Sequence, residues 1–311
     1  ISTLKAAKKG HIDECIRVAV SEGLSPVTAL QAATLNAAEL LKVDSELGSI
    51  APGKVADMLI LDDLPNLKIS LVIANGEVVA KDGRFLLELE APRYPEFMYN
   101  TVKLKRPLKR EDLEIGAPEM REVVTVRVIG ARDGTLVSED RRATLKVQGG
   151  LLKQDVERDL LKIAMIDRFH LSGKIGKGFV QGFNLRRGAI GTTYTPNTEN
   201  IIVVGATDDD MCLAVNRIAE MGGGHIVVQD GEVLAQFELP LCGLLSEEPA
   251  EVVLEKESRL YEVIRQMGCS LTDPFHTLAF LGPSPEIGTL KICEEGVLNV
   301  PALRIESLIV E

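Results

Sequence analysis

The chain has 311 residues, of which 45% are hydrophobic, and a formal net charge of −11. This length and hydrophobic content predict about two globular domains with sizeable cores. The 46 acidic residues against 35 basic ones exclude a nucleic-acid backbone as an expected partner, since phosphate binding needs a basic face. No apolar run reaches the roughly 18 to 20 residues that cross a bilayer, and no signal-peptide pattern follows Ile1, so we expect a cytoplasmic protein without a membrane partner.

The side chains that commonly bind metals are scattered along the sequence. The five cysteines form no Cys-x-x-Cys pair, which predicts buried thiols in place of a disulfide framework or a structural zinc site. The four histidines, at positions 11, 170, 225 and 276, include no His-x-His pair. We therefore expect no metal site formed by this chain alone.

Residues 1–44 have the spacing of helices. Apolar residues recur at helical intervals from Cys15 to Val20, and Ser25-Pro26 supplies a cap and a first-turn proline for a helix over Val27–Leu41. Two helices need a surface to pack on, and residues 1–44 provide none. We therefore expect the sequence to be the C-terminal piece of a longer protein.

Residues 45–85 have the pattern of antiparallel strands. Ala51-Pro52-Gly53 predicts a tight turn that leads into the strand Met58–Leu61. Asn75-Gly76 then lies between the apolar runs Leu67–Ile73 and Glu77–Ala80, which predicts a hairpin.

The remaining residues divide into a linker and an α/β domain. Residues 86–120 carry prolines interleaved with charges, which is typical of a linker or wrapping segment. From residue 121 onward, strands alternate with helices, for example the strand Ile201–Val204, the helix through Met211–Met221 and the strand Ile226–Val228. The glycine triplet 222–224 follows this helix instead of opening it, which argues against a phosphate-binding loop.

Several of these motifs occur in an order that resembles the amidohydrolase superfamily. They are Gly10-His11-Ile12-Asp13, then Thr34-x-Asn36-x-Ala38, then Gly48-x-Ile50-x-Pro52-Gly53-x-x-Ala56-Asp57, then Asn75-Gly76. Residues from about 122 to 301 resemble the C-terminal domain of adenine deaminases. The resemblance implies a mixed α/β and α+β chain: terminal helices of a TIM-like barrel in 1–44, part of a small β-sandwich in 45–85, a linker in 86–120, and a C-terminal α/β domain in 121–311.

The resemblance also implies a reaction. Adenine deaminases are metal-dependent hydrolases that convert adenine and water to hypoxanthine and ammonia, with a divalent metal that is Mn, Fe or Zn. Their metal ligands would lie on barrel strands upstream of Ile1, so this chain alone is expected to be inactive and its catalytic residues are unknown. The implied partners are the missing N-terminal barrel, a purine-like small molecule and further copies of the same chain in a homo-oligomer.

The sequence departs from the family at two places. Where adenine deaminases carry His-Asp-x-His-Asn, this chain has residues 196–200, in which only Asn200 agrees. Where they carry Arg-His, it has Arg168-Phe169, with His170 one position later. The lost imidazoles keep two alternatives open: a deaminase or hydrolase acting on a different purine-like substrate, and a non-catalytic assembly or substrate-capping module. An independent small-molecule-binding domain rests only on the glycine-rich segments 173–188 and 188–205.

The segment Thr193–Asn200 is the candidate substrate site. It lies between two apolar strands and holds several polar side chains that a plain turn does not need. We expect it to line a cleft, and the candidate residues are His170, Tyr194, Asn197, Glu199 and Asn200. In a full-length enzyme, Asn200→Ala should impair activity with little loss of folding stability. The alternative is a solvated loop held by Asx-type turns.

Overall fold

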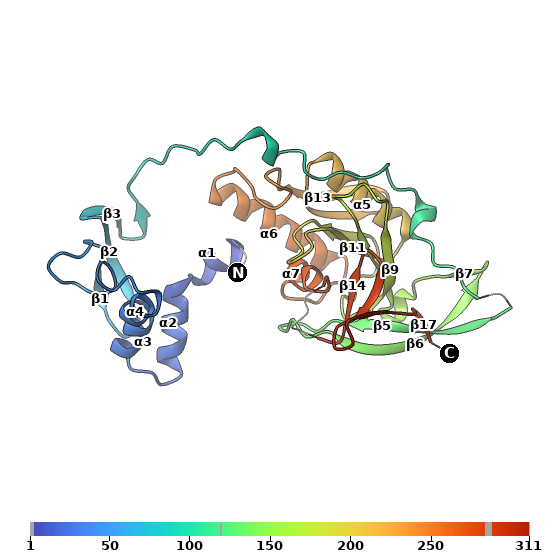
Figure 1. Ribbon diagram of the computed structural model, residues 1–311, viewed down its shortest axis with the longest axis horizontal. Helices are drawn as coiled ribbons and strands as arrows, with labels where there is room; N and C mark the ends of the chain where they lie inside the picture. Colours follow the sequence, from blue (N-terminus) through green and yellow to red (C-terminus); the bar gives the residue numbers. More distant parts are fainter. Residues whose placement is uncertain (1–2, 119, 284–287, 311) are drawn as a thin grey trace. The chain divides into compact units, whose positions relative to one another are not determined.

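The computed structural model describes residues 3–118, 120–283 and 288–310. The chain forms two compact units, one ending at Pro92 and the other beginning at Arg93 (Figure 1). Both units combine helices with strands, so the expected mixed α/β class is confirmed. A closed barrel does not occur among the described residues.

The first unit begins with four short helices: α1 (Thr3–Lys9), α2 (Ile12–Ser21), α3 (Pro26–Ala33) and α4 (Leu35–Leu41). Ser25 caps α3 as predicted, because its side chain accepts a hydrogen bond from the backbone N–H of Thr28. The single helix predicted over Val27–Leu41 is wrong, because the chain leaves the helical conformation at Thr34. The hydroxyl of Thr34 donates to the carbonyl of Leu30, a local bond that competes with helix continuation.

The strands of the first unit form one antiparallel sheet in the order β1 (Met58–Asp63), β2 (Lys68–Ala74), β3 (Glu77–Lys81), β4 (Arg84–Phe85). The hairpin predicted at Asn75-Gly76 is confirmed: both residues are left-handed, with φ of 51° and 82°, as a type I′ turn requires. Strands β1 and β4 stand at the two edges of this sheet.

The first unit buries few apolar side chains for its size. Its buried cluster consists of Ile16, Ala29 and Leu67, with partly buried neighbours around them. Large apolar side chains remain exposed on its helices, its turns and its sheet, including Leu40, Ile50, Leu59, Ile60 and Phe85.

The second unit is organised around one large sheet. Its strands are β5 (Val123–Gly130), β6 (Glu139–Gln148), β7 (Leu151–Leu152), β8 (Leu161–Ile166), β9 (Ile175–Gln181), β10 (Ala189–Thr192), β11 (Ile201–Gly205), β12 (Gly224–Gln229), β13 (Glu232–Glu238) and β17 (Ile309–Val310). The order across the sheet is β13-β12-β10-β11-β8-β9-β5-β6-β7, with β17 beside β5 near the C-terminus (Figure 1). The pairs are antiparallel except β5 with β9.

The other elements of the second unit flank this sheet. A small antiparallel sheet contains β14 (Leu290–Cys293), β15 (Gly296–Asn299) and β16 (Arg304–Glu306). The helices are α5 (Asp208–Glu220), α6 (Ala250–Gln266) and α7 (Pro274–Ala279), and the 3-10 turns are η1 (Glu96–Met98), η2 (Arg110–Leu113) and η3 (Val156–Arg158). None of the helices in the described ranges is both long and apolar enough to cross a membrane.

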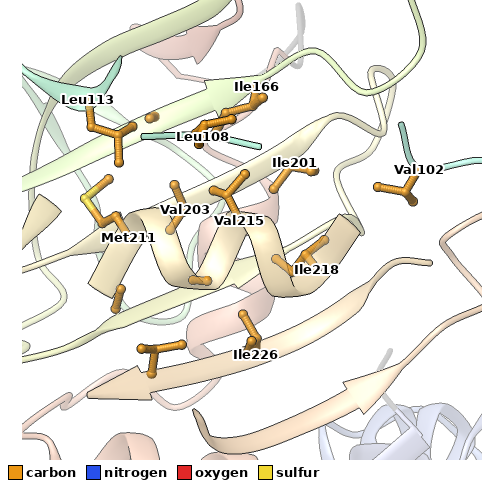
Figure 2. Close-up of a cluster of buried hydrophobic side chains, with 14 residues drawn as sticks. Val102, Leu108, Leu113, Ile166, Ile201, Val203, Met211, Val215, Ile218 and Ile226 are labelled. Atoms are coloured by element: carbon orange, nitrogen blue, oxygen red, sulfur yellow. The ribbon is translucent and has the colours of Figure 1, made fainter. Parts of the chain in front are cut away.

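The main core lies between α5 and the sheet. Met211 and Val215 of α5 and Val203 of β11 belong to one buried cluster (Figure 2). Leu108 and Leu113, from segment 101–115, belong to the same cluster. Segment 101–115 is therefore more than a spacer, because its apolar side chains complete the core of the second unit.

Candidate functional site

Two loops meet at the end of the paired strands β8 and β11. These strands are antiparallel, with Ile166 opposite Ile201. The loop that follows Ile166 and the loop that precedes Ile201 must therefore leave the sheet side by side. The first loop spans residues 167–174 and the second residues 193–200, and together with the turn at 241–245 they form the candidate site.

Asp167 organises the first loop. Its carboxylate accepts hydrogen bonds from the backbone N–H groups of Phe169, His170 and Ser172 and from the Ser172 hydroxyl. Nδ1 of His170 lies 3.1 Å from the same carboxylate. Burial alone would raise the pKa of Asp167, but these donors outweigh it and hold the pKa well below its usual value. Asp167 is therefore a structural anion at neutral pH.

The guanidinium of Arg168 lies over the ring of Phe169 in the same loop, 4.3 Å from the ring centroid, and also contacts the other segments of the site. Its side chain is 1% exposed, and Nε donates to the carbonyl of Glu199 while Nη1 donates to the carbonyl of Cys242, at 3.0 Å, and contacts Thr101 Oγ1 at 3.5 Å. Nη2 makes no hydrogen bond to the described residues and lies 3.9 Å from Oε2 of Glu199. Burial lowers the pKa of Arg168 to about 10, so the guanidinium stays charged at neutral pH.

The second loop is fixed by buried hydroxyl and amide groups. The Thr193 hydroxyl donates to the carbonyl of Gly243 at 2.5 Å and accepts from the N–H of Gly224 at 2.9 Å. The Thr195 hydroxyl donates to the carbonyl of Asn200 across the loop. Asn200 is 5% exposed, accepts from the N–H of Arg168 and donates toward Oε2 of Glu294 at 3.4 Å.

Non-glycine residues with left-handed backbone occur in the two segments whose carbonyls Arg168 binds. Asn197, Glu199 and Cys242 have φ of 75°, 52° and 56°. Such a conformation is uncommon for side chains like those of Glu and Cys and persists only where the surroundings impose it. The carbonyls of Glu199 and Cys242 are the two that Arg168 binds. The buried guanidinium of Arg168 therefore holds two of the left-handed residues by their carbonyl groups.

The structure brings the predicted site residues to neighbouring loops and exposes them unequally. His170 is 83% exposed on the first loop, and Tyr194 is 45% exposed on the second. Asn197 donates to the carbonyl of Pro283 from an exposed position, and Glu199 presents a half-exposed carboxylate. Asn200 is instead buried and hydrogen-bonded at both ends of its amide.

A small pocket of about 160 Å³ borders the first loop. Apolar and charged side chains share its lining, which consists of Leu104, Lys105, Arg106, Leu108, Asp112, Ile166, Asp167, Gly173 and Ile175. None of the four predicted residues of the second loop lines it. A cleft at that loop stays a prediction.

Sequence reasoning missed the residues that hold the site together. Arg168, Thr193 and Gly243 were not candidates, although their contacts fix both loops. A signal was present in the charged pair Asp167-Arg168, which directly follows the apolar run Ile163–Ile166. Within the described ranges, no three His, Cys, Asp or Glu side chains lie close enough together to hold a metal ion.

Comparison of the sequence with known proteins shows the family of the chain. The sequence profile of the adenine deaminase C-terminal domain matches residues 135–303, and that of the amidohydrolase family matches residues 5–79. The chain belongs to the adenine deaminase family. Among curated relatives it is 37% identical to an adenine deaminase of Clostridium botulinum over 98% of its own length, and 38% identical to one of Moorella thermoacetica over 96%. An adenine deaminase of Mesorhizobium japonicum is 38% identical over 97%.

The family matches follow the division of the chain seen in the structure. The amidohydrolase match covers helices and strands of the first unit, and the C-terminal domain match covers most of the second, including both site loops. The chain spans about half the length of the curated relatives it matches, since it covers 50% of each of the three.

Proposed function

We propose that this chain is the C-terminal half of a cytoplasmic adenine deaminase and that it acts together with an N-terminal metal-dependent barrel. The observation that carries the proposal is the alignment of almost the whole chain with one half of curated adenine deaminases. In this proposal the four short helices end the barrel, and the β1–β4 sheet is part of a small sandwich. The exposed apolar side chains of the first unit support it, because a covering partner would bury them.

The chemistry would be divided between the two halves. The barrel would hold a divalent metal that lowers the pKa of bound water and supplies the hydroxide for attack on the ring carbon. The described part of this chain has no cluster that fits such an ion, so its own contribution would be to bind and enclose the purine. We assign that task to the loops carrying His170, Tyr194, Asn197, Glu199 and Asn200. Further copies of the chain would assemble into a homo-oligomer.

Fragment complementation tests this function. The chain is fused behind the N-terminal half of the Moorella thermoacetica relative, and release of ammonia and hypoxanthine from adenine is measured with added Mn²⁺, Fe²⁺ or Zn²⁺. Turnover is expected from the fusion and from the relative's own rejoined halves, but from neither half alone. Turnover by the 311-residue chain alone, or a folded but inactive fusion beside an active control, would contradict the proposal.

A second candidate is deamination of a different aminopurine. It is favoured by the carboxylate of Glu199, which is half-exposed on the second loop. A carboxylate accepts hydrogen bonds only, so it favours a ligand with an additional N–H donor. The same fusion should be assayed with adenine, guanine and 2,6-diaminopurine, and a preference for the amino-rich purines would establish this candidate over adenine.

A further inference from the structure

Arg168 is the common partner of three segments that are far apart in sequence. Its guanidinium binds the carbonyl of Glu199 in the second loop, the carbonyl of Cys242 in the adjacent turn, and Thr101 in the segment that enters the unit. Its backbone N–H donates to Asn200. Removing this one side chain would remove the single group that contacts all three segments.

Burying the charged guanidinium of Arg168 costs free energy unless hydrogen-bonding partners replace the water that it loses. A fully buried cation needs partners that replace water, and a nearby carboxylate is the usual one. The carboxylate of Glu199 lies 3.9 Å away, beyond hydrogen-bonding distance. Two backbone carbonyls accept hydrogen bonds from the guanidinium, and the ring of Phe169 covers its face. Because carbonyls belong to the main chain, the guanidinium fixes the path of the backbone.

The backbone that Arg168 fixes is the part with unusual conformation. Glu199 and Cys242 are both left-handed, and each offers its carbonyl to the guanidinium. The left-handed conformation is uncommon for a Glu residue, and its backbone path sets the direction in which the side chain of Glu199 leaves the loop. If the contact were lost, the loop would be free to relax, and the Glu199 carboxylate would change direction.

We propose that Arg168 is the positioning residue of the 193–200 loop, which it holds so that the carboxylate of Glu199 faces an N–H or amino group of the bound purine. The assignment rests on the proposed function, because the purine would bind at this loop. Arg168 itself touches no substrate. Its planar fork reaches two carbonyls at once, which the single ammonium group of a lysine cannot reproduce with the same geometry.

The first measurement concerns the loop alone. Backbone hydrogen exchange is followed by mass spectrometry in the unaltered 311-residue chain, in Arg168→Lys and in Arg168→Met. We expect peptides covering 193–200 and 241–245 to exchange at least about tenfold faster in both variants, the loss that corresponds to one hydrogen bond from a charged donor. Arg142, an exposed residue of β6, provides the matched controls Arg142→Lys and Arg142→Met, which should leave these peptides unchanged.

The second measurement concerns the substrate. In the fused protein, Arg168→Lys should raise KM about tenfold and change kcat by less than about threefold, because a misplaced binding group weakens substrate binding without touching the hydrolytic centre. Glu199→Gln should also raise KM. The double variant with Arg168→Lys should raise it little further, since both changes affect one contact.

The outcomes separate the two proposals. An inactive fusion with unaltered Arg168 contradicts the proposed function. Unchanged exchange in 193–200 overturns the assignment of Arg168, whatever the fusion does. Faster exchange with an unchanged KM also overturns it, because the loop would then move without affecting the substrate. Arg168→Lys retains charge and most of the volume, so it keeps the test informative if Arg168→Met fails to fold.

Discussion

The guanidinium of Arg168 lies so close to Gly243 that no side chain fits at position 243. A Cβ atom on Gly243 would overlap Nη1 of Arg168 and would lie 2.8 Å from Cγ2 of Val102. Gly243 also has a φ of +72°, and its carbonyl accepts from Thr193. The turn at 241–245 is thus shaped to receive the guanidinium.

The first prediction is that Gly243→Ala destabilises the second unit more than a glycine substitution in open space. Gly134 is the matched control, since it has the same φ of +72° and a Cβ atom there would meet nothing within 4 Å. Gly134→Ala should cost about 1 kcal/mol for the left-handed conformation. Gly243→Ala should cost about 2 to 4 kcal/mol because strain and overlap add. Denaturant unfolding measures both, and equal costs would show that the turn yields without disturbing Arg168.

The second prediction concerns the pH dependence that Asp167 confers. Its pKa is lower in the folded than in the unfolded chain, so its stabilisation is present above the unfolded value of about 3.9 and is lost as pH falls below it. Asp167→Asn should therefore cost about 2 kcal/mol or more at neutral pH, and this difference should shrink between pH 4 and pH 2. Unfolding curves from pH 2 to 7 test this, with the exposed Asp44→Asn as control. A pH-independent difference would contradict it.

The third prediction concerns Lys291, a fully buried lysine on β14. Its ammonium group donates to the carbonyls of Leu136 and Phe280, and burial lowers its pKa to about 8 from the ordinary 10.5. Between these values the unfolded chain binds more protons than the folded one, so stability rises with pH. Replacement by an apolar side chain removes this dependence.

The measurement compares Lys291→Met with the unaltered chain from pH 7 to 10. The unaltered chain should gain stability relative to the variant above pH 8, by up to about 1.4 kcal/mol per pH unit. Lys146→Met, at an exposed position of β6, should give a curve parallel to that of the unaltered chain. If the stability curve of Lys291→Met is also parallel to that of the unaltered chain, the ammonium group of Lys291 is hydrated in the folded protein.

The fourth prediction revises the expected effect of replacing Asn200. The sequence alone predicts little loss of stability. In the structure, however, Asn200 is buried and both ends of its side-chain amide are hydrogen-bonded. Asn200→Ala should therefore lower the free energy of unfolding by about 1 to 3 kcal/mol as well as impairing the fused enzyme. Asn200→Asp keeps the acceptor for Arg168 but turns a second carboxylate toward Glu294, so it should recover stability as pH falls below about 5. If neither substitution changes the free energy of unfolding, the hydrogen bonds of the Asn200 side chain do not contribute to stability.

Local chemistry was sufficient to predict the features that depend on neighbouring residues. Ser25 caps its helix, and Asn75-Gly76 turns its hairpin, because each needs only backbone groups within a few positions. The break at Thr34 was missed, since apolar spacing continues through it while the hydroxyl bonds backward. The apolar strand predicted at Ile201–Val204 is confirmed as β11, which extends one residue further to Gly205.

The candidate site could be predicted only in part. The polar side chains of the 193–200 loop made it a candidate site. The side chain that holds this loop is Arg168, which lies 31 positions before its partner Glu199. Residue type alone predicts an exposed side chain at position 168, because arginine is ordinarily exposed. The sequence does not show that Gly243 lies against it, or that β5 runs parallel to β9. These relationships arise from packing between distant segments.

The entry of the chain into the second unit limits how far its first unit can reach. Leu86 is still bonded to Val79, whereas Met98 accepts from the N–H of Cys242 and Tyr99 donates to Glu247. The tether between these anchors is residues 87–97, which can extend over at most about 40 Å. A partner that binds both units would therefore meet the second unit at a millimolar effective concentration once it has bound the first.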